Sequence, residues 1–130
     1  MSEDRRPRSV YVFSPDEDVA RSLALDLERT YSIVRVTSLE ALSSAMKTSI
    51  PNALVLDLYT HSDDVTRLLS LVRERCPGVP IITLRGYIPL RKDLSLTIEE
   101  MSFEVLYKPV DAEQVSSVIH SVLNAPSVRT

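Results

Sequence analysis

Short apolar runs alternate with amphipathic segments along the whole chain. The most regular run, PNALVLDLYT over residues 51–60, is apolar up to a single carboxylate, Asp57, and the chain turns polar after it. Such a run is typical of a central parallel strand that helices cover on both faces. A carboxylate at its carboxyl end lies where open α/β sheets keep their binding crevices. The alternative is that Asp57 merely ends the strand and caps the next turn.

Four more apolar runs predict strands, over residues 9–13, 32–36, 80–84 and 104–107. Arg35 interrupts the second strand, which we therefore place near a sheet edge. Apolar positions at helical spacing predict a helix after each strand. For the first helix we expect a capping box, with Ser14 as N-cap and Glu17 three residues later, and an end near Thr30. Ser38 and Asp111 are the expected caps of the second and fifth helices.

The third helix is expected over residues 63–75, and the fourth presents an apolar face from Leu90 to Met101. Five strands that alternate with five helices predict a doubly wound parallel α/β sheet with right-handed crossovers. We expect this domain over residues 9–124, with a flexible leader over 1–8 and a flexible tail over 125–130.

Composition narrows the class of protein. A chain of 130 residues with a net charge of −3 is one ordinary domain and does not call for nucleic acid or an anionic membrane as partner. Two glycines are too few for a phosphate-binding loop or a dinucleotide fingerprint. The single cysteine, Cys76, excludes an internal disulfide and a cysteine-based zinc site. With no membrane-spanning run and no signal peptide, a cytoplasmic location fits best.

Two motifs resemble response-regulator receiver domains of two-component signalling: LVLDL around Asp57, and YKPV, which contains Lys108 and Pro109. The resemblance covers roughly Ser9 to Leu123. It implies a flavodoxin-like (βα)5 fold with strand order 2-1-3-4-5, and a role in phosphorelay signal transduction rather than an enzyme. It also implies that Asp57 is the phosphoacceptor position, that Lys108 contacts the phosphoryl group, and that the bond to Pro109 is cis.

The chain departs from the family where receivers usually carry two adjacent acids that help to hold Mg²⁺. Here these positions are Ser14 and Pro15. Asp16 is the nearest replacement, but one residue along a helix turns a side chain by about 100°. Mg²⁺ needs hard oxygen ligands, so we expect no metal cofactor; a weak Mg²⁺ site that uses Asp16 is the alternative.

Two further positions differ. Ungapped counting places Arg85 where receivers have a phosphoryl-contacting Thr or Ser, whereas a competing register uses Thr83. Arg85 either pairs with Asp57 in place of a metal or points to solvent. The aromatic switch position holds Val105. Tyr107 is aromatic, but we assign it to the opposite face of the strand, because neighbouring strand residues face opposite ways.

Phosphoryl transfer depends on positioning and on neutralising charge, which Mg²⁺ largely supplies. We therefore expect an atypical receiver (pseudo-receiver) with impaired phosphorylation, which works mainly by binding proteins. A histidine kinase or a downstream signalling protein would dock on the face of the fourth helix, fifth strand and fifth helix, and a homodimer is a further option. Apolar candidates on this face are Tyr87, Ile88, Leu90, Tyr107 and Val110.

Two other functions stay open: a working phosphoacceptor receiver with Asp57 phosphorylated by a histidine kinase, and a small-ligand binder at the same crevice. Outside the crevice, His61 with Asp63 and Asp64 could bind a metal loosely or form an ordinary polar loop. We expect His120 at the surface and no nucleophilic role for Cys76. No effector segment is recognisable after Leu123, so the output is expected from another protein or domain.

Overall fold

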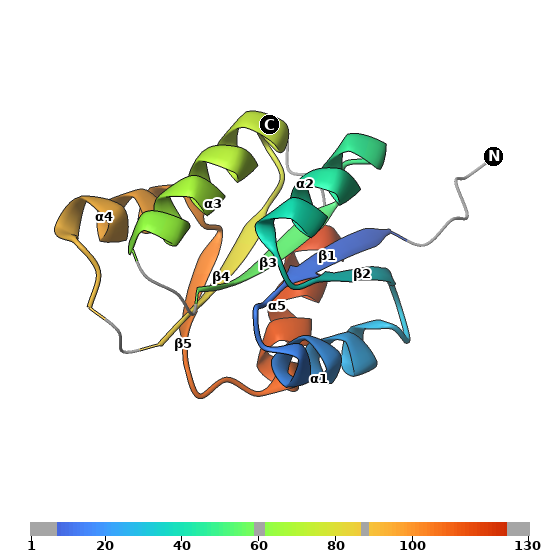
Figure 1. Cartoon of the computed structure of the whole chain (residues 1–130). Helices are drawn as coiled ribbons and strands as arrows, with labels where there is room; N and C mark the ends of the chain where they lie inside the picture. The colour runs from blue at the N-terminus through green and yellow to red at the C-terminus, as the bar shows by residue number, and fades with distance from the viewer. Residues whose placement is uncertain (1–7, 59–61, 87–88, 125–130) are drawn as a thin grey trace, which may run out of the picture.

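The computed structural model describes residues 8–58, 62–86 and 89–124, which form five strands and five helices in strict alternation (Figure 1). The strands are β1 (Ser9–Phe13), β2 (Ser32–Val36), β3 (Ala53–Leu58), β4 (Ile81–Arg85) and β5 (Glu104–Tyr107). The helices are α1 (Glu17–Leu27), α2 (Leu39–Thr48), α3 (Ser62–Arg75), α4 (Lys92–Met101) and α5 (Ala112–Asn124).

The strands form one parallel sheet in the order β2-β1-β3-β4-β5, as predicted. β3 lies in the middle, and all six of its residues are buried. The strand that contains Arg35 is an edge strand, also as predicted. The register aligns Phe13 of β1 with Leu56 of β3, and Asp57 with Leu84 of β4. The carboxyl ends of the three inner strands therefore lie side by side.

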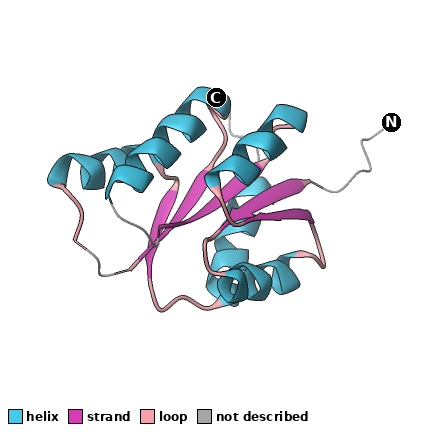
Figure 2. Ribbon diagram, in the orientation of Figure 1, coloured by secondary structure: helices cyan, strands magenta, loops and turns pink. Residues whose placement is uncertain are grey.

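Helices cover both faces of the sheet (Figure 2). One face packs on α1 and α5, and its core contains Val12, Val55 and Leu84 from the sheet. The other face packs on α2, α3 and α4, with Phe13 and Leu56 among its buried side chains. Because side chains alternate between the faces, the inner strands must be apolar on both sides, and the unbroken apolar run of β3 follows from this, whereas the edge strands β2 and β5 carry exposed polar residues.

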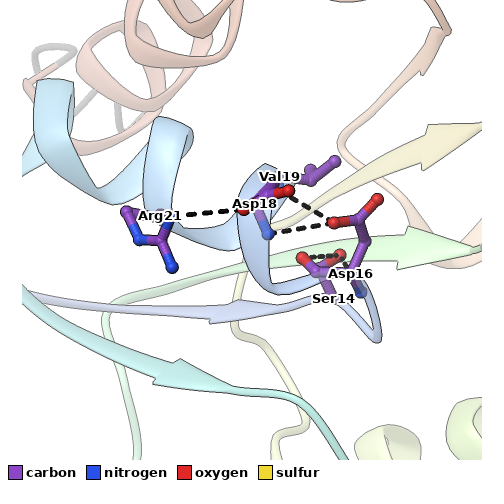
Figure 3. Close-up of polar contacts among 5 residues, drawn as sticks. All are labelled: Ser14, Asp16, Asp18, Val19 and Arg21. Atoms are coloured by element: carbon purple, nitrogen blue, oxygen red, sulfur yellow. Dashed lines mark hydrogen bonds and ion pairs between the residues drawn. The ribbon is translucent and has the colours of Figure 1, made fainter.

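The start of α1 differs from the prediction. The N-cap is Asp16, not Ser14, and its carboxylate accepts hydrogen bonds from the backbone N–H groups of Asp18 and Val19 at 2.9 and 3.4 Å (Figure 3). The helix accordingly begins at Glu17 and ends at Leu27, short of the expected Thr30. Ser14 lies too early in the chain to cap this helix: its hydroxyl accepts a hydrogen bond from the Asp16 N–H at 3.0 Å and also contacts the buried Asp57 carboxylate at 2.6 Å.

The other two caps follow the prediction. The Ser38 hydroxyl accepts a hydrogen bond from the Ala41 N–H at 3.1 Å and so caps α2. At the start of α5 the Gln114 side chain accepts from the Asp111 N–H at 3.0 Å, which is one half of a capping box. None of the helices among the described residues is both long enough and apolar enough to span a membrane.

Candidate functional site

Asp57 is the penultimate residue of β3, and its side chain is fully buried. A buried carboxylate is stable only when hydrogen bonds or opposite charges compensate for the water that it has lost. Here both oxygens are engaged. The Ser14 hydroxyl donates a hydrogen bond of 2.6 Å to Oδ2, and the Lys108 ammonium forms an ion pair with Oδ1.

The register explains why these three side chains meet. Val12 pairs with Val55 and Phe13 with Leu56, so Ser14 follows at the level of Asp57 and on the same face of the sheet. Leu106 of β5 pairs with Leu84 of β4, and Leu84 pairs with Asp57. Lys108 lies two residues after Leu106 and therefore projects from the same face of the sheet as Asp57.

The main chain holds Lys108 close to the sheet. Its N–H donates to the Arg85 carbonyl at 2.7 Å, and its peptide bond to Pro109 is cis. The lysine side chain remains 23% exposed, whereas the carboxylate that it pairs with is fully buried. The β3 and β5 motifs thus meet at one point although fifty residues of chain separate them.

Arg85 does not reach Asp57, which corrects the expectation that it replaces a metal there. Among the described residues it makes no ion pair, and its guanidinium carbon lies 5.7 Å from the ring centroid of Tyr107. The reason is parity: Asp57 pairs with Leu84, so Arg85, one residue further, projects from the opposite face of the sheet. Stacking on a neighbouring aromatic ring then stabilises the cation.

Thr83, the alternative to Arg85, is buried one pair below Asp57, where its hydroxyl lies 2.6 Å from the Ser102 hydroxyl. It pairs with Val105 on β5, and Val105 packs against the core on the α4 side. Among the described residues, the Thr83 hydroxyl forms no hydrogen bond with Asp57, and Val105 offers no polar side-chain group. The hydroxyl group next to the buried carboxylate comes instead from Ser14, the residue directly after β1.

Our assignment of Tyr107 to the opposite face from Val105 was wrong. The two residues are two positions apart, and they pair with Arg85 and Thr83, which are also two apart, so all four share a face. Tyr107 is 49% exposed and lies beside Arg85 at the edge of the sheet. An arginine and a tyrosine therefore stand together at the ends of β4 and β5.

The polar groups do not fit a Mg²⁺ site. Mg²⁺ takes oxygen ligands in a strict octahedral arrangement and is usually bound through carboxylates. Asp57 already contacts Ser14 and Lys108. Asp16 is occupied as the cap of α1, and Pro15 offers no side-chain oxygen. No cluster of three or more His, Cys, Asp or Glu side chains suited to a metal occurs among the described residues.

The remaining candidates lie elsewhere. His61, Tyr87 and Ile88 fall outside the described residues. The exposed side chain of His120 contacts the buried Tyr31, whose hydroxyl lies 2.8 Å from its Nδ1; the sequence carried no signal of this contact. Cys76 is buried, and burial raises the pKa of its thiol, which makes it a poor nucleophile.

The sequence matches no protein-family model, and a search of curated proteins finds no match. Comparison of the fold with solved structures does find similar proteins. A two-component response regulator from Clostridium difficile has a TM-score of 0.77 at 17% sequence identity, with 93% of this chain and 99% of that chain covered.

Two more similar structures carry different descriptions. A CheY-like response regulator receiver domain protein from Methanospirillum hungatei has a TM-score of 0.68 at 19% identity, covering 89% of this chain and 97% of that one. A structure described as an adenylate cyclase from Rhodopirellula baltica has a TM-score of 0.77 at 16% identity, covering 91% and 88%. At such identities the likeness concerns the fold. The chain therefore has the flavodoxin-like fold of response-regulator receiver domains.

Proposed function

We propose that this protein is an atypical receiver domain of two-component signal transduction, which acts mainly by binding other proteins and has impaired Mg²⁺-dependent phosphorylation at Asp57. In this proposal the protein is not an enzyme. Asp57 occupies the phosphoacceptor position but accepts a phosphoryl group inefficiently. The fold and the two motifs support the receiver assignment. The contacts of the buried carboxylate support the impairment.

The observation that carries the proposal is the double engagement of Asp57. Attack on a phosphoryl group needs a carboxylate oxygen that can approach phosphorus. Here one oxygen accepts a short hydrogen bond from Ser14, and the other pairs with Lys108. In the phosphorylation reaction a metal would help to neutralise the charge on the transferred group, and this pocket holds too few acids for it.

Restoring the acids tests this explanation directly. We would incubate the protein with acetyl phosphate and Mg²⁺ and resolve the phosphorylated form on a phosphate-affinity gel. The unaltered protein should show little or no phosphoprotein. The double variant Ser14→Asp/Pro15→Asp should gain both Mg²⁺ binding and phosphorylation, because it returns two carboxylates to the end of β1.

Asp57→Asn in the restored background is the matched control and should abolish the gained signal. Stoichiometric, acid-labile phosphate on the unaltered protein that disappears in Asp57→Asn would contradict the proposal. It would favour the alternative, a working phosphoacceptor receiver for a histidine kinase.

The protein-binding surface is part of the same proposal. Three of the five large apolar side chains that are exposed among the described residues lie on one segment: Leu96 on α4, Phe103 before β5 and Tyr107 at its end. Leu90 and Val110, which we also expected on this face, are half-buried and therefore expose less apolar surface than these three. All three belong to the stretch of residues 96–107, and exposed apolar side chains on adjoining elements are a feature of protein-interaction sites. We assign the docking of a kinase, a downstream protein or a second copy to this α4–β5 face.

A further inference from the structure

A cavity of about 240 Å³ opens beside Asp57, on the opposite side from Lys108 and the β5 end. It lies between the carboxyl ends of β1 and β3 and the first turns of α2 and α3. In the order β2-β1-β3-β4-β5 the chain leaves β1 toward one edge and β3 toward the other. This is the topological switch point of the sheet, where doubly wound folds bind their ligands.

The floor of the cavity is apolar. Phe13, Leu58 and Leu68 line it, and each is itself at most 5% exposed, so these side chains are fixed by the core beneath them. A rigid apolar floor favours a flat hydrophobic ligand over a hydrated ion, because burying apolar surface is worth about 25 cal/mol per Å². The volume lies just below the usual range for drug-sized ligands, about 300–1,000 Å³, and suits a single ring with one polar group.

Among the described residues, the rim of the cavity carries a net negative charge. Glu40 and Asp64 line it together with one cation, Arg67. The Arg67 guanidinium lies 3.9 Å from the Asp64 carboxylate; it lines the cavity beside Glu40 as well, but Glu40 forms no ion pair with it or with any other described residue. Asp57 also faces the cavity but is compensated by Lys108. Of the described acidic groups at the cavity, the one without an ion pair is thus the Glu40 carboxylate on the first turn of α2.

From the apolar floor and the free carboxylate we infer that this cavity binds a small organic cation, with an aromatic or aliphatic body on Phe13 and Leu58 and an amine or amidine group toward Glu40. This goes beyond the proposed interaction function and does not rest on it. Failure of the phosphorylation assay and failure of ligand binding are separate outcomes, because one concerns the chemistry of Asp57 and the other the α2 side of the cavity.

Three nearly isosteric probes test the inference. Benzamidine, benzamide and benzoate share a ring and a planar substituent but carry charges of +1, 0 and −1. In amide NMR titrations of the full chain, benzamidine should bind most tightly and benzoate least. The shifts should saturate and cluster on residues 37–40, 58 and 64–68. Added salt should weaken benzamidine more than benzamide, because it screens the attraction to Glu40.

Two variants locate the site. Glu40→Gln should weaken benzamidine about two- to fivefold, the range for one exposed ion pair, and leave benzamide unchanged. Glu99→Gln, which removes an exposed acid from α4, is the matched control and should change neither. Thr37→Trp should block the rim and abolish binding of both probes, whereas Thr48→Trp at the far end of α2 should not.

Three results would overturn the inference: no saturable shifts with benzamidine, equal binding of all three probes, or unaltered binding in Thr37→Trp. Displacement of benzamidine by Mg²⁺ well beyond the effect of matched ionic strength would also overturn it, because the site would then belong to a metal ion. Since Glu40 is exposed, the Glu40→Gln variant should fold normally. The test therefore stays decisive even if the Thr37→Trp variant fails to fold.

Discussion

At the scale of single residues, the main feature of the protein is one carboxylate that is shielded from water. Asp57 is fully buried, and Ser14 and Lys108 supply its two compensating contacts. Removing two charged groups from water costs several kcal/mol per ion, and the attraction between them can be smaller than this cost. A buried ion pair is therefore no proof of a net gain in folding stability. Removing only one partner is a different matter, because the other charge stays buried.

We therefore predict that Lys108→Ala lowers the free energy of unfolding by about 2–3 kcal/mol. The value is below that for a fully buried pair because the lysine side chain is 23% exposed. The double variant Asp57→Asn/Lys108→Ala should lose less than the sum of the single variants, since it leaves no unpaired charge. Urea denaturation of the four proteins measures this coupling.

Arg91→Ala is the control for that cycle. Its partner Asp93 is 3.4 Å away and both side chains are more than half exposed, so the loss should stay within about 0.5 kcal/mol. If Lys108→Ala costs no more than Arg91→Ala, the ion pair at Asp57 does not compensate a buried charge in solution.

The meeting of Asp57 with Lys108 was predictable, because both follow parallel strands whose carboxyl ends share one edge of the sheet. The placement of Arg85 was not. A long side chain at a strand end can turn either to the carboxylate or to a nearby ring, and only the register, Asp57 with Leu84 and Arg85 with Tyr107, decides between them. The same register could have been used to place Tyr107 and to find the Ser14 contact.

At the scale of elements, capping decides which polar groups are left for chemistry. Ser, Pro, Asp and Glu in a row offer two possible starts for α1, with Ser14 or with Asp16 as the cap. Local pattern alone favours Ser14 because a glutamate follows at the right spacing. In the structure the serine hydroxyl contacts Asp57 and also accepts from the Asp16 N–H in the turn before the helix, and Asp16 is the cap. The helix start and the site are therefore linked.

We predict that Asp16→Ala lowers the stability of the domain by about 1 kcal/mol, because the N–H groups of Asp18 and Val19 lose their acceptor. Asp16→Asn keeps a capping oxygen and should remain within a few tenths of a kcal/mol of the unaltered protein. Thermal or urea unfolding measures both. Equal stability of Asp16→Ala and the unaltered protein would show that the cap contributes nothing and that this carboxylate is free for another role.

At the scale of the whole molecule, both faces of the sheet are covered and the exposed apolar groups are not evenly spread. Five strands and five helices could be predicted because each apolar run must be buried on both sides, which is a local requirement that the sequence displays directly. The surface that partners use could not be read in the same way. An apolar residue near a strand end looks alike in sequence whether it packs inward or faces solvent, as Val105 and Tyr107 do.

We predict that Phe103→Ser/Tyr107→Ser weakens binding to a second copy or to a partner kinase about tenfold or more, the effect expected for two central aromatic contacts. Folding stability should change by no more than about 1 kcal/mol, because both side chains are about half exposed in the free protein. Sedimentation velocity measures self-association, and surface-immobilised kinase domains measure the partner contact.

Leu25→Ser on α1 is the matched control, since Leu25 is 62% exposed on a helix that covers the other face of the sheet. If this variant weakens association as much as the aromatic pair does, or the pair has no effect on either assay, the α4–β5 face is not the docking surface.

The order of the strands also bears on how the protein is made. Of the five strands of this sheet β1 is synthesised first, yet it lies between β2 and β3 and pairs with both. A nascent chain that has emerged only as far as α2 can form the β1–β2 pair but leaves the second edge of β1 open. Ribosome-bound chains that stop before Ala53 should therefore be sensitive to proteases, and protection should rise once β3 has left the exit tunnel and closed that edge.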